Sequence, residues 1–342
     1  MNNITSQLRN YTRQNRSRIV VALVGLLVST IVIIIIVHSI DISATASLLT
    51  QVSFWNLLLL VLLYLISFIF RTCRWRLIIR PIYSFPKFSH SLMSIIIGYA
   101  ANNVLPVRGG EFVRMVYFSR LTGISKTFTI SSIISERILD GLALLCILVI
   151  SSVLSETNPF NEQWFDVLLL TSTIVFLSAL LFLVMVRIWG HKLSSYIESR
   201  YSSKAMKLFN HLLINISNSV QFMGFSINTL SIVTLSLVIW CIEGLMYVAA
   251  IKIVGLSFNI FAGYLILSIV NFGILIPSAP AYVGVFQGMT ILGMRLFNVS
   301  EEIALSVGIL VHICQFVPVT LSGAFIFLCE MFRKNGRLND GI

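Results

Sequence analysis

Long apolar stretches, separated by short polar segments, run through most of this 342-residue chain. A helix that crosses the hydrocarbon core of a membrane needs about 20 consecutive apolar residues. We therefore expect full membrane spans at residues 19–37, 54–70, 128–154, 167–186, 230–250 and 303–328. The first stretch resembles a signal peptide with a cleavage site at Ala44-Thr45-Ala46. It is longer than the apolar core of about 7–15 residues in such peptides, so we interpret it as a retained helix.

Two further apolar regions are each split into short limbs by proline and glycine. The limbs lie at residues 91–105 and 112–121, and at 261–276 and 285–297. The first break contains Pro106 with Gly109 and Gly110, and the second contains Pro277 with Pro280. Short limbs around such a break are typical of re-entrant hairpins. The pattern predicts an all-α polytopic membrane protein with about six full spans and two broken re-entrant hairpins.

The composition excludes a water-soluble or disordered chain. Hydrophobic residues make up 57% of the sequence, charged residues only 11%, and the mean hydropathy is +0.93. A soluble domain carries about 25% charged residues. The 5 cysteines are odd in number and form no C-x-x-C pair, so we interpret them as small packing residues. We expect no disulfide framework, no metal and no cofactor.

The positive charges follow the predicted topology. The chain has 24 Lys and Arg against 13 Asp and Glu, and a net charge of +11 would suggest nucleic acid in a soluble protein. With the N-terminus inside and both hairpins returning to the side they left, all but three of the 24 lie on the inner side. Lys252 and Arg295 lie outside, and Arg137 lies in a span. The positive-inside rule predicts a multi-pass protein of the cytoplasmic (inner) membrane with both termini cytoplasmic, and lipids rather than nucleic acid as partners.

The order of spans and hairpins repeats in the two halves of the chain. Residues 1–165 and 166–342 each hold two spans, a broken hairpin and a third span, within a single membrane domain. Because each half crosses the membrane an odd number of times, the second half is inverted, which is typical of transporters whose site lies at broken helices. A weak local sequence similarity between the two hairpins supports the repeat. Asn102, Pro106 and Glu111 in the first correspond to Asn271, Pro277 and Gln287 in the second.

A basic segment after the fourth predicted span indicates an amphipathic helix. One helical face carries Met206, Phe209, Leu213, Ile216 and Val220, and the opposite face carries Lys204, Lys207 and His211. Such a helix either lies on the membrane surface or packs on the protein with its charged face toward solvent. The pattern leaves both interpretations open.

The first break carries ionisable residues that suit an anionic ligand. Arg108 and Arg114 flank Glu111, and a guanidinium group binds phosphate oxygens through parallel N–H groups while it stays charged. Gly109 and Gly110 allow backbone N–H groups to approach a ligand, and a helix that restarts at Glu111 adds its positive end. Ionisable groups at membrane depth are functional by default. The alternative is a neutralised structural cap on the hairpin.

The predicted span at 128–154 contains Glu136, Arg137 and Asp140. Glu136 and Asp140 are four residues apart and share a helix face, and Arg137 is available as a partner for Glu111. These residues are therefore predicted to belong to the lipid site. The alternative is that they lie at the cytoplasmic end of the span and simply contact water.

Charged residues near two other spans have competing interpretations. Glu243 is isolated in its span, where it either pairs with Arg137 or Lys252, couples transport to protons, or stays neutral without a role. Arg71 and Arg74 follow the second span. They either anchor it at the membrane edge or capture a lipid phosphate before it enters the protein.

Together these segments resemble the membrane region of the lysylphosphatidylglycerol synthases, a flippase-like family, over nearly the whole chain. The resemblance is carried by residues 71–76, 103–114, 135–140 and 277–284. The family often has Gly at the position of Ala281 and an acid at that of Gln287. The resemblance implies translocation of a lipid with a polar or charged head group, and related stand-alone members are linked to polyprenyl-phosphate glycan pathways. Lysyl transfer is not expected, because the chain ends at Ile342 after the last span.

We therefore predict an integral membrane lipid translocase that moves an anionic phospholipid or a polyprenyl-phosphate-linked lipid between leaflets, with a membrane synthase or glycan-assembly proteins as further partners. The alternatives are a membrane enzyme of polyprenyl-linked glycan metabolism, such as a glycosyltransferase or lipid phosphatase, and a non-catalytic membrane subunit. A multi-span glycosyltransferase usually needs an acidic pair in an outside loop near the first span, and only Asp41 lies there. A lipid phosphatase needs a Ser or His nucleophile beside an Arg, and Ser278 has no adjacent Arg or His. Both observations disfavour the enzyme interpretation. Metalloprotease, Walker and nucleophile-elbow motifs are also lacking in the sequence.

No catalytic residue is predicted, and Glu243 is the candidate for proton coupling. The predicted lipid-binding residues are Arg71, Arg74, Asn103, Arg108, Glu111, Arg114, Glu136, Arg137, Asp140, Pro277, Pro280 and Gln287.

Overall fold

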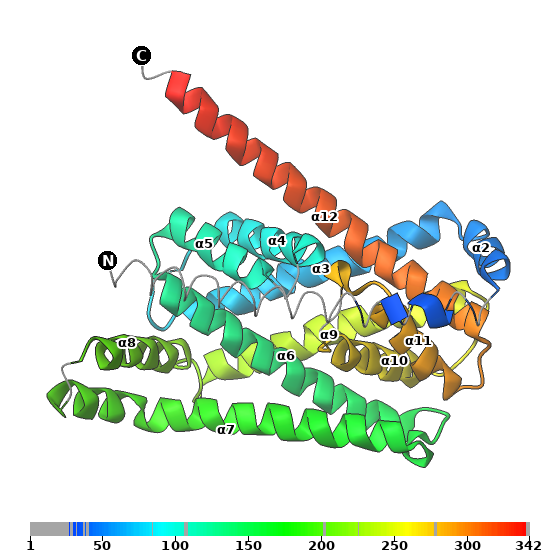
Figure 1. The fold of residues 1–342 in the computed structure, drawn as a ribbon, viewed down its shortest axis with the longest axis horizontal. Helices are drawn as coiled ribbons and strands as arrows, with labels where there is room; N and C mark the ends of the chain where they lie inside the picture. Colours follow the sequence, from blue (N-terminus) through cyan, green and yellow to red (C-terminus); the bar gives the residue numbers. More distant parts are fainter. Residues whose placement is uncertain are drawn as a thin grey trace, which may run out of the picture.

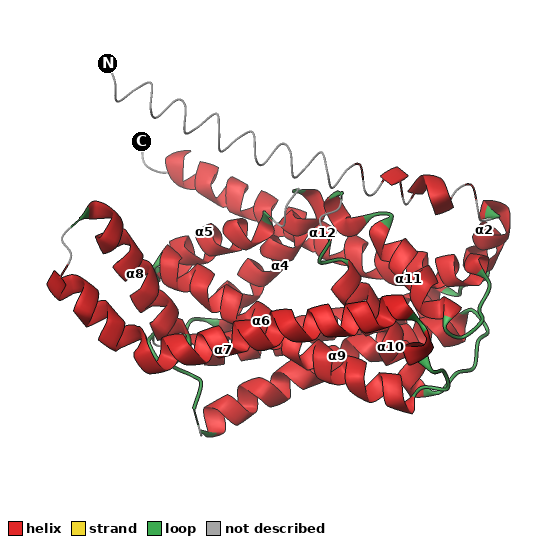
Figure 2. Ribbon diagram, turned by 60° about the horizontal axis from the view of Figure 1, so that its bottom comes forward, coloured by secondary structure: helices red, strands yellow, loops and turns green. Residues whose placement is uncertain are grey.

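The computed structural model describes residues 27, 30–31, 33–36, 38, 41–83, 85–105, 109–200, 203–224, 226–276 and 279–339. All regular structure in these residues is helical, as Figure 2 shows. The α-helices are α2 (Ile42–Thr50), α3 (Phe54–Ile79), α4 (Phe88–Val104), α5 (Gly110–Thr122), α6 (Lys126–Leu154), α7 (Gln163–Arg200), α8 (Lys204–Ser219), α9 (Ile227–Ile253), α10 (Ile260–Gly273), α11 (Val285–Arg295) and α12 (Glu301–Asn339). Two short 3-10 helices are η2 (Pro159–Asn161) and η3 (Pro280–Tyr282).

Five helices in the described residues are long and apolar enough to cross a membrane. They are α3, α6, α7, α9 and the Glu301–Met331 part of α12. They coincide with five of the six spans that the sequence predicts, and the all-helical membrane class is therefore confirmed. The remaining predicted span, residues 19–37, lies for the most part outside the described residues and stays a prediction.

Polar caps set where several of these helices begin. The side chains of Ser53, Ser226 and Asn259 each accept a hydrogen bond from a backbone N–H three residues further along the chain. Such a cap satisfies one of the N–H groups that the first helical turn leaves without a partner. The helices α3, α9 and α10 therefore start just after a short polar loop.

Two pairs of short helices form around the proline and glycine breaks. α4 packs against α5 on either side of the first break, and α10 packs against α11 on either side of the second. The second break is conformationally strained, because Ala281 (φ 59°) and Tyr282 (φ 61°) both adopt the left-handed region that favours glycine. The resemblance to a family with Gly at position 281 is consistent with this geometry. The re-entrant placement of the two pairs in the membrane stays a prediction.

We expect Gly110→Ala to force α5 away from α4. A Cβ atom at position 110 would lie 2.0 Å from the carbonyl oxygen of Gly98 and 2.6 Å from the backbone nitrogen of Asn102, neither of which can move aside cheaply. Overpacking of this kind costs about 1–3 kcal/mol, so the melting temperature of the purified protein should fall. Gly293→Ala is the matched control, because a Cβ there meets atoms no closer than 3.5 Å. Equal melting temperatures for the two variants would contradict the close contact.

The helix packing relates the two halves of the chain. α3 lies against α9, and the main contacts of one half have counterparts in the other. The contact α3–α4 corresponds to α9–α10, α4–α12 to α10–α6, and α5–α6 to α11–α12. Two structurally related halves would produce this pattern. The division of the chain at residue 165 and the inversion of the second half stay predictions.

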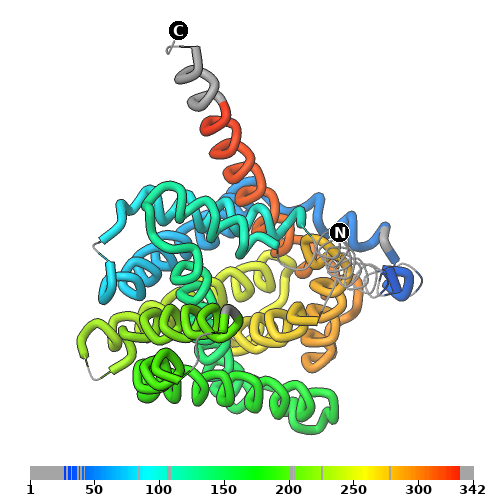
Figure 3. Tube along the Cα trace, turned by 60° about the vertical axis from the view of Figure 1, so that its left-hand side comes forward, coloured from blue at the N-terminus to red at the C-terminus, as the bar shows by residue number. Residues whose placement is uncertain are grey.

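The amphipathic helix α8 packs on the protein. It lies beside α7 (Figure 1) and also contacts α6. The contact is an apolar cluster of Val186, Ile197 and Leu213, with Met206 and Ile216 packed against it. The structure shows the helix packed on the protein, with Phe209 of the predicted apolar face 51% exposed. A position on the membrane surface stays a prediction. The last part of α12 projects away from the other helices (Figures 1 and 3).

The cysteines are only partly the packing residues that the sequence suggests. All five are free thiols, and Cys314 is buried. Cys146, Cys241 and Cys329 are exposed, on helices that are long and apolar enough to cross a membrane.

Candidate functional site

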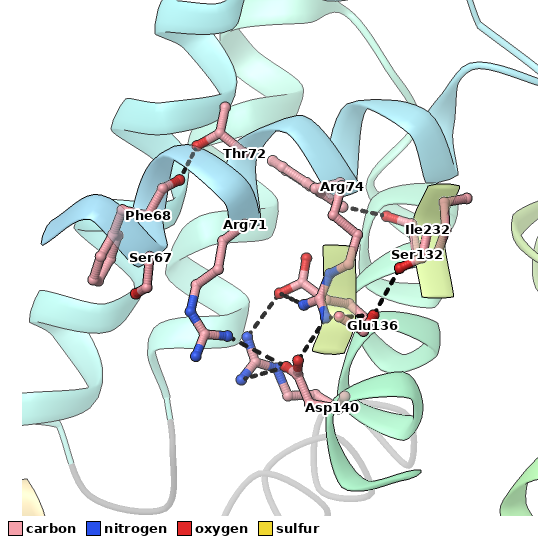
Figure 4. A network of polar contacts seen from close by, with 12 residues as sticks. Ser67, Phe68, Arg71, Thr72, Arg74, Ser132, Glu136, Asp140 and Ile232 are labelled. Atoms are coloured by element: carbon pink, nitrogen blue, oxygen red, sulfur yellow. Dashed lines mark hydrogen bonds and ion pairs between the residues drawn. The ribbon is translucent and has the colours of Figure 1, made fainter. Parts of the chain in front are cut away.

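A network of ion pairs lies buried where α3, α6 and α9 meet. Arg71 and Arg74 extend from α3 toward Glu136 and Asp140 on α6, as Figure 4 shows. The spacing of three residues on α3 and four on α6 places each pair on one face of its helix. The sequence pattern therefore aligns two cations with two anions across a helix–helix contact.

Arg74 and Arg114 form the fully enclosed part of the network. Arg74 donates from Nη1 to Asp140 Oδ1 over 2.7 Å and to the hydroxyl of Ser236 over 3.0 Å. Arg114 donates from both terminal nitrogens to the two carboxylate oxygens of Glu136, over 3.1 and 2.9 Å. Its guanidinium also stacks 3.9 Å from the ring centroid of Trp75. Bidentate pairing and ring stacking are what an Arg needs to be stable away from water.

Arg71 joins this network to α9. Its Nη2 donates to Glu243 Oε1 over 2.6 Å, and its Nη1 lies 3.5 Å from Asp140 Oδ2. The guanidinium lies 5.1 Å from the Trp240 ring and 5.4 Å from the Tyr99 ring. Its Nε and Nη1 atoms are buried and make no hydrogen bond to the described residues. Arg71 therefore keeps unused donor capacity, as the other three arginines of the network also do, but of the four only Arg71 and Arg137 line the pocket described below.

Arg137 is the more accessible cation of the network, with 30% of its side chain exposed. Its Nη2 donates to Glu136 Oε1 over 2.8 Å and to the hydroxyl of Tyr99 over 3.1 Å. It also lies 3.7 Å from Glu111 and 3.5 Å from Asp140. The expected partnership of Arg137 with Glu111, which ties α5 to α6, is present in the structure as an ion pair.

The formal charges of the network balance. Its cations are Arg71, Arg74, Arg114 and Arg137, and its anions are Glu111, Glu136, Asp140 and Glu243. Burying an unpaired charge costs roughly several kcal/mol. A bundle of apolar helices can therefore hold these charges only as a balanced set. Such a network has no excess of positive charge. An anionic ligand would bind to it by displacing a carboxylate from an arginine.

A pocket with a volume of about 350 Å³ opens beside one side of this network. The charged residues in its wall are Arg71, Glu111, Arg137, Asp140 and Glu243. Neutral polar residues come from other helices, namely Asn102 and Asn103 of α4, Asn271 of α10, and His312 and Gln315 of α12. Elements of both halves of the chain therefore share one cavity.

The structure separates the predicted lipid-binding residues into two groups. Arg71, Asn103, Glu111, Arg137 and Asp140 line the pocket, together with Glu243. Arg74, Arg114 and Glu136 are buried in the network but are not part of the pocket wall. Arg108 and Pro277 lie outside the described residues.

The remaining predicted residues lie near the second break. Pro280 begins η3 and is not part of the pocket wall. Gln287 accepts from the backbone N–H of Gly284 over 2.8 Å, and its Nε2 lies 2.9 Å from Nδ1 of the pocket residue His312. Gln287 therefore positions the imidazole ring and the break.

Several expectations about these charges are wrong in detail. Arg71 and Arg74 are 2% and 0% exposed and do not form a solvated membrane edge. Glu243 pairs with Arg71, neither with Arg137 nor with Lys252. The alternative that Glu136 and Asp140 contact water is also wrong, because both are buried. The backbone N–H of Gly110, expected to face a ligand, donates to Asn102 Oδ1 over 2.8 Å.

Of the neutral polar residues in the pocket wall, sequence reasoning placed only Asn103 among the lipid-binding candidates. Asn102 and Asn271 stood out in the sequence only as matching positions in the two halves. His312 and Gln315 lie inside the apolar run that forms α12. Polar residues inside a span, at His312 and Gln315, were the available signal. In the described residues no three His, Cys, Asp or Glu side chains gather as a metal site.

Apolar helices long enough to span a membrane, with a buried ion-pair network beside a polar pocket, define a multi-pass membrane protein with an internal cavity. The chain belongs to the lysylphosphatidylglycerol synthase TM region family, whose model matches residues 22–323. Among curated proteins it is similar to two from Methanocaldococcus jannaschii. The UPF0104 membrane protein MJ1078 is 26% identical over 66% of this chain and 92% of the relative. The UPF0104 membrane protein MJ1595 is 25% identical over 91% of this chain and 96% of the relative.

Proposed function

We propose that the protein is a flippase-like lipid translocase that moves an anionic phospholipid or a polyprenyl-phosphate-linked lipid between leaflets. The observation that carries the proposal is the pair Arg71 and Arg137 in the wall of a pocket inside a bundle of membrane-spanning helices. A lipid phosphate has to cross hydrocarbon, and guanidinium groups that are already desolvated compensate its charge there.

The unused donors of Arg71 suit a phosphate. Its Nε and Nη1 make no hydrogen bond within the described residues, while Nη2 is held by Glu243. A phosphate oxygen that enters the pocket would replace Glu243 as the partner of Arg71. Glu243 would then be a buried carboxylate without its cation, and uptake of a proton would relieve that cost. Proton coupling at Glu243 is therefore part of the proposal.

The arrangement of the halves supports alternating access. Asn102 and Asn271, each on the helix that precedes a break, both line the pocket, and the helix contacts of one half correspond to those of the other. Transporters built from inverted repeats hold their substrate where broken helices meet. In this proposal both termini lie on the cytoplasmic side of the inner membrane, and a membrane synthase or glycan-assembly enzyme supplies the lipid.

Leaflet exchange in proteoliposomes tests the proposal. The purified protein is reconstituted with a trace of a phosphatidylglycerol that carries a fluorophore on its acyl chain, and a membrane-impermeant quencher reports the fraction in the outer leaflet. We expect exchange with the protein that exceeds protein-free vesicles and that a labelled phosphatidylcholine does not match. A pH gradient should change the rate. Exchange equal to that of protein-free vesicles would overturn translocation, and a covalently altered lipid in mass spectrometry would establish the enzyme alternative instead.

A further inference from the structure

The pocket extends from the ion-pair network to the outer surface of the bundle. Its wall contains Arg71, which is 2% exposed, and also Val175 of α7 and Leu275 just after α10, which are 54% and 46% exposed. One continuous cavity therefore joins the buried cations to a surface between α7 and the end of α10. This part of the wall carries no charge.

The outer part of the cavity is apolar throughout. Besides Val175 and Leu275, it is lined by Leu144 and Gly141 of α6, Phe176 of α7 and Phe272 of α10. We name these six residues the apolar groove. α7 is less buried within the bundle than any of the other four long apolar helices in the described residues. Its outward surface therefore faces hydrocarbon when the helices span a membrane.

Phe176, one of the groove residues, packs against both α6 and α10. Its ring lies against Gly141, where a Cβ atom would come within 1.8 Å of a ring carbon. The same ring lies 5.7 Å from the ring centroid of Phe272 on α10. The absence of a side chain at position 141 is therefore what lets the Phe176 ring lie between α6 and α10.

We propose that the apolar groove binds a hydrocarbon chain of the lipid whose phosphate is held at Arg71 and Arg137. The inference rests on the proposed function and assigns a tail-binding site to it. We infer this occupant because one cavity has a cationic end and an apolar, lipid-facing end. These two ends match the phosphate and the hydrocarbon chain of an anionic lipid. The Phe176 ring narrows the groove and shifts when a chain enters.

Site-specific photo-crosslinking tests the groove. A photoreactive amino acid is placed at Val175, in vesicles that contain phosphatidylglycerol and phosphatidylcholine with identical acyl chains. Leu177 is the matched control, because it is 49% exposed on the same helix but is not part of the pocket wall. Two residues further along a helix is a rotation of about 200°, so the control faces bulk lipid.

We expect the position-175 probe to capture phosphatidylglycerol several-fold in excess of its share in the vesicle, and the position-177 probe to follow the bulk composition. Equal lipid ratios at the two positions would overturn the groove. If leaflet exchange is present while the ratios are equal, only this inference fails. If selective capture occurs without exchange, the groove binds the lipid and translocation fails.

The glycine beneath the Phe176 ring provides an independent test. Gly141→Ala should push the ring outward, so we expect a several-fold change in exchange rate together with a changed capture ratio at position 175. Gly244→Ala is the control. A Cβ atom at position 244 would lie 2.0 Å from a carbon of the Tyr264 ring, and neither residue belongs to the pocket wall. If both variants alter exchange and capture equally, Phe176 has no gating role.

Discussion

Glu136→Gln is expected to remove a large part of the stability of the folded protein. The Glu136 side chain is 0% exposed and holds both terminal nitrogens of Arg114 and Nη2 of Arg137, with Arg74 3.7 Å away. Removing its charge leaves buried guanidinium groups without a counter-charge. Breaking a buried pair in this way costs about 3–5 kcal/mol, whereas whole domains are stable by only about 5–15 kcal/mol.

The measurement is thermal unfolding of the purified protein in detergent, together with the yield of folded protein from membranes. Glu198→Gln is the control, because Glu198 is exposed near the end of α7 and changes the net charge by the same amount. We expect the control to melt like the wild type and Glu136→Gln to melt much lower or to accumulate poorly. A melting temperature for Glu136→Gln within error of the control would show that the network is not what holds α3, α5 and α6 together.

The helices were predictable because the membrane imposes a simple length rule. Apolar runs long enough to span gave α3, α6, α7, α9 and α12, and Pro and Gly marked both breaks. The limits of the helices were less accurate. The sequence placed the end of the second span at Phe70, because charges follow it, whereas α3 continues to Ile79. It continues because Arg71 and Arg74 face buried acids rather than water.

The membership of the site was partly predictable, and the pairing within it was not. Ionisable residues inside apolar runs single out Glu136, Asp140 and Glu243, since burial makes such residues costly unless they are paired. Which cation each acid binds depends on how distant helices pack. Arg71 and Glu243 are 172 residues apart in the sequence and meet only because α3 lies against α9.

Replacing the Arg71–Glu243 pair as a unit is expected to keep the fold and strongly reduce translocation. Arg71→Gln alone leaves Glu243 buried without its cation and should destabilise the protein. The double variant Arg71→Gln/Glu243→Gln removes one positive and one negative charge, so the remaining network stays balanced, and Asp140 keeps Arg74 at 2.7 Å. Removing both partners of a buried pair is often close to neutral for stability, so the double variant should melt near the wild-type temperature.

Translocation should fall with the same change, because the phosphate loses one of the two cations in the pocket wall. A hydrogen bond to a charged group contributes about 1.5–3 kcal/mol and about 1.4 kcal/mol corresponds to a factor of ten, so we expect exchange of the anionic lipid to fall at least about tenfold. The control is Arg295→Gln/Glu301→Gln, which removes an ion pair whose Arg side chain is 59% exposed. If the double variant is stable and exchanges phosphatidylglycerol at the wild-type rate, Arg71 holds the helices together and does not bind the lipid. Because the double variant stays folded, a changed exchange rate cannot be attributed to unfolding.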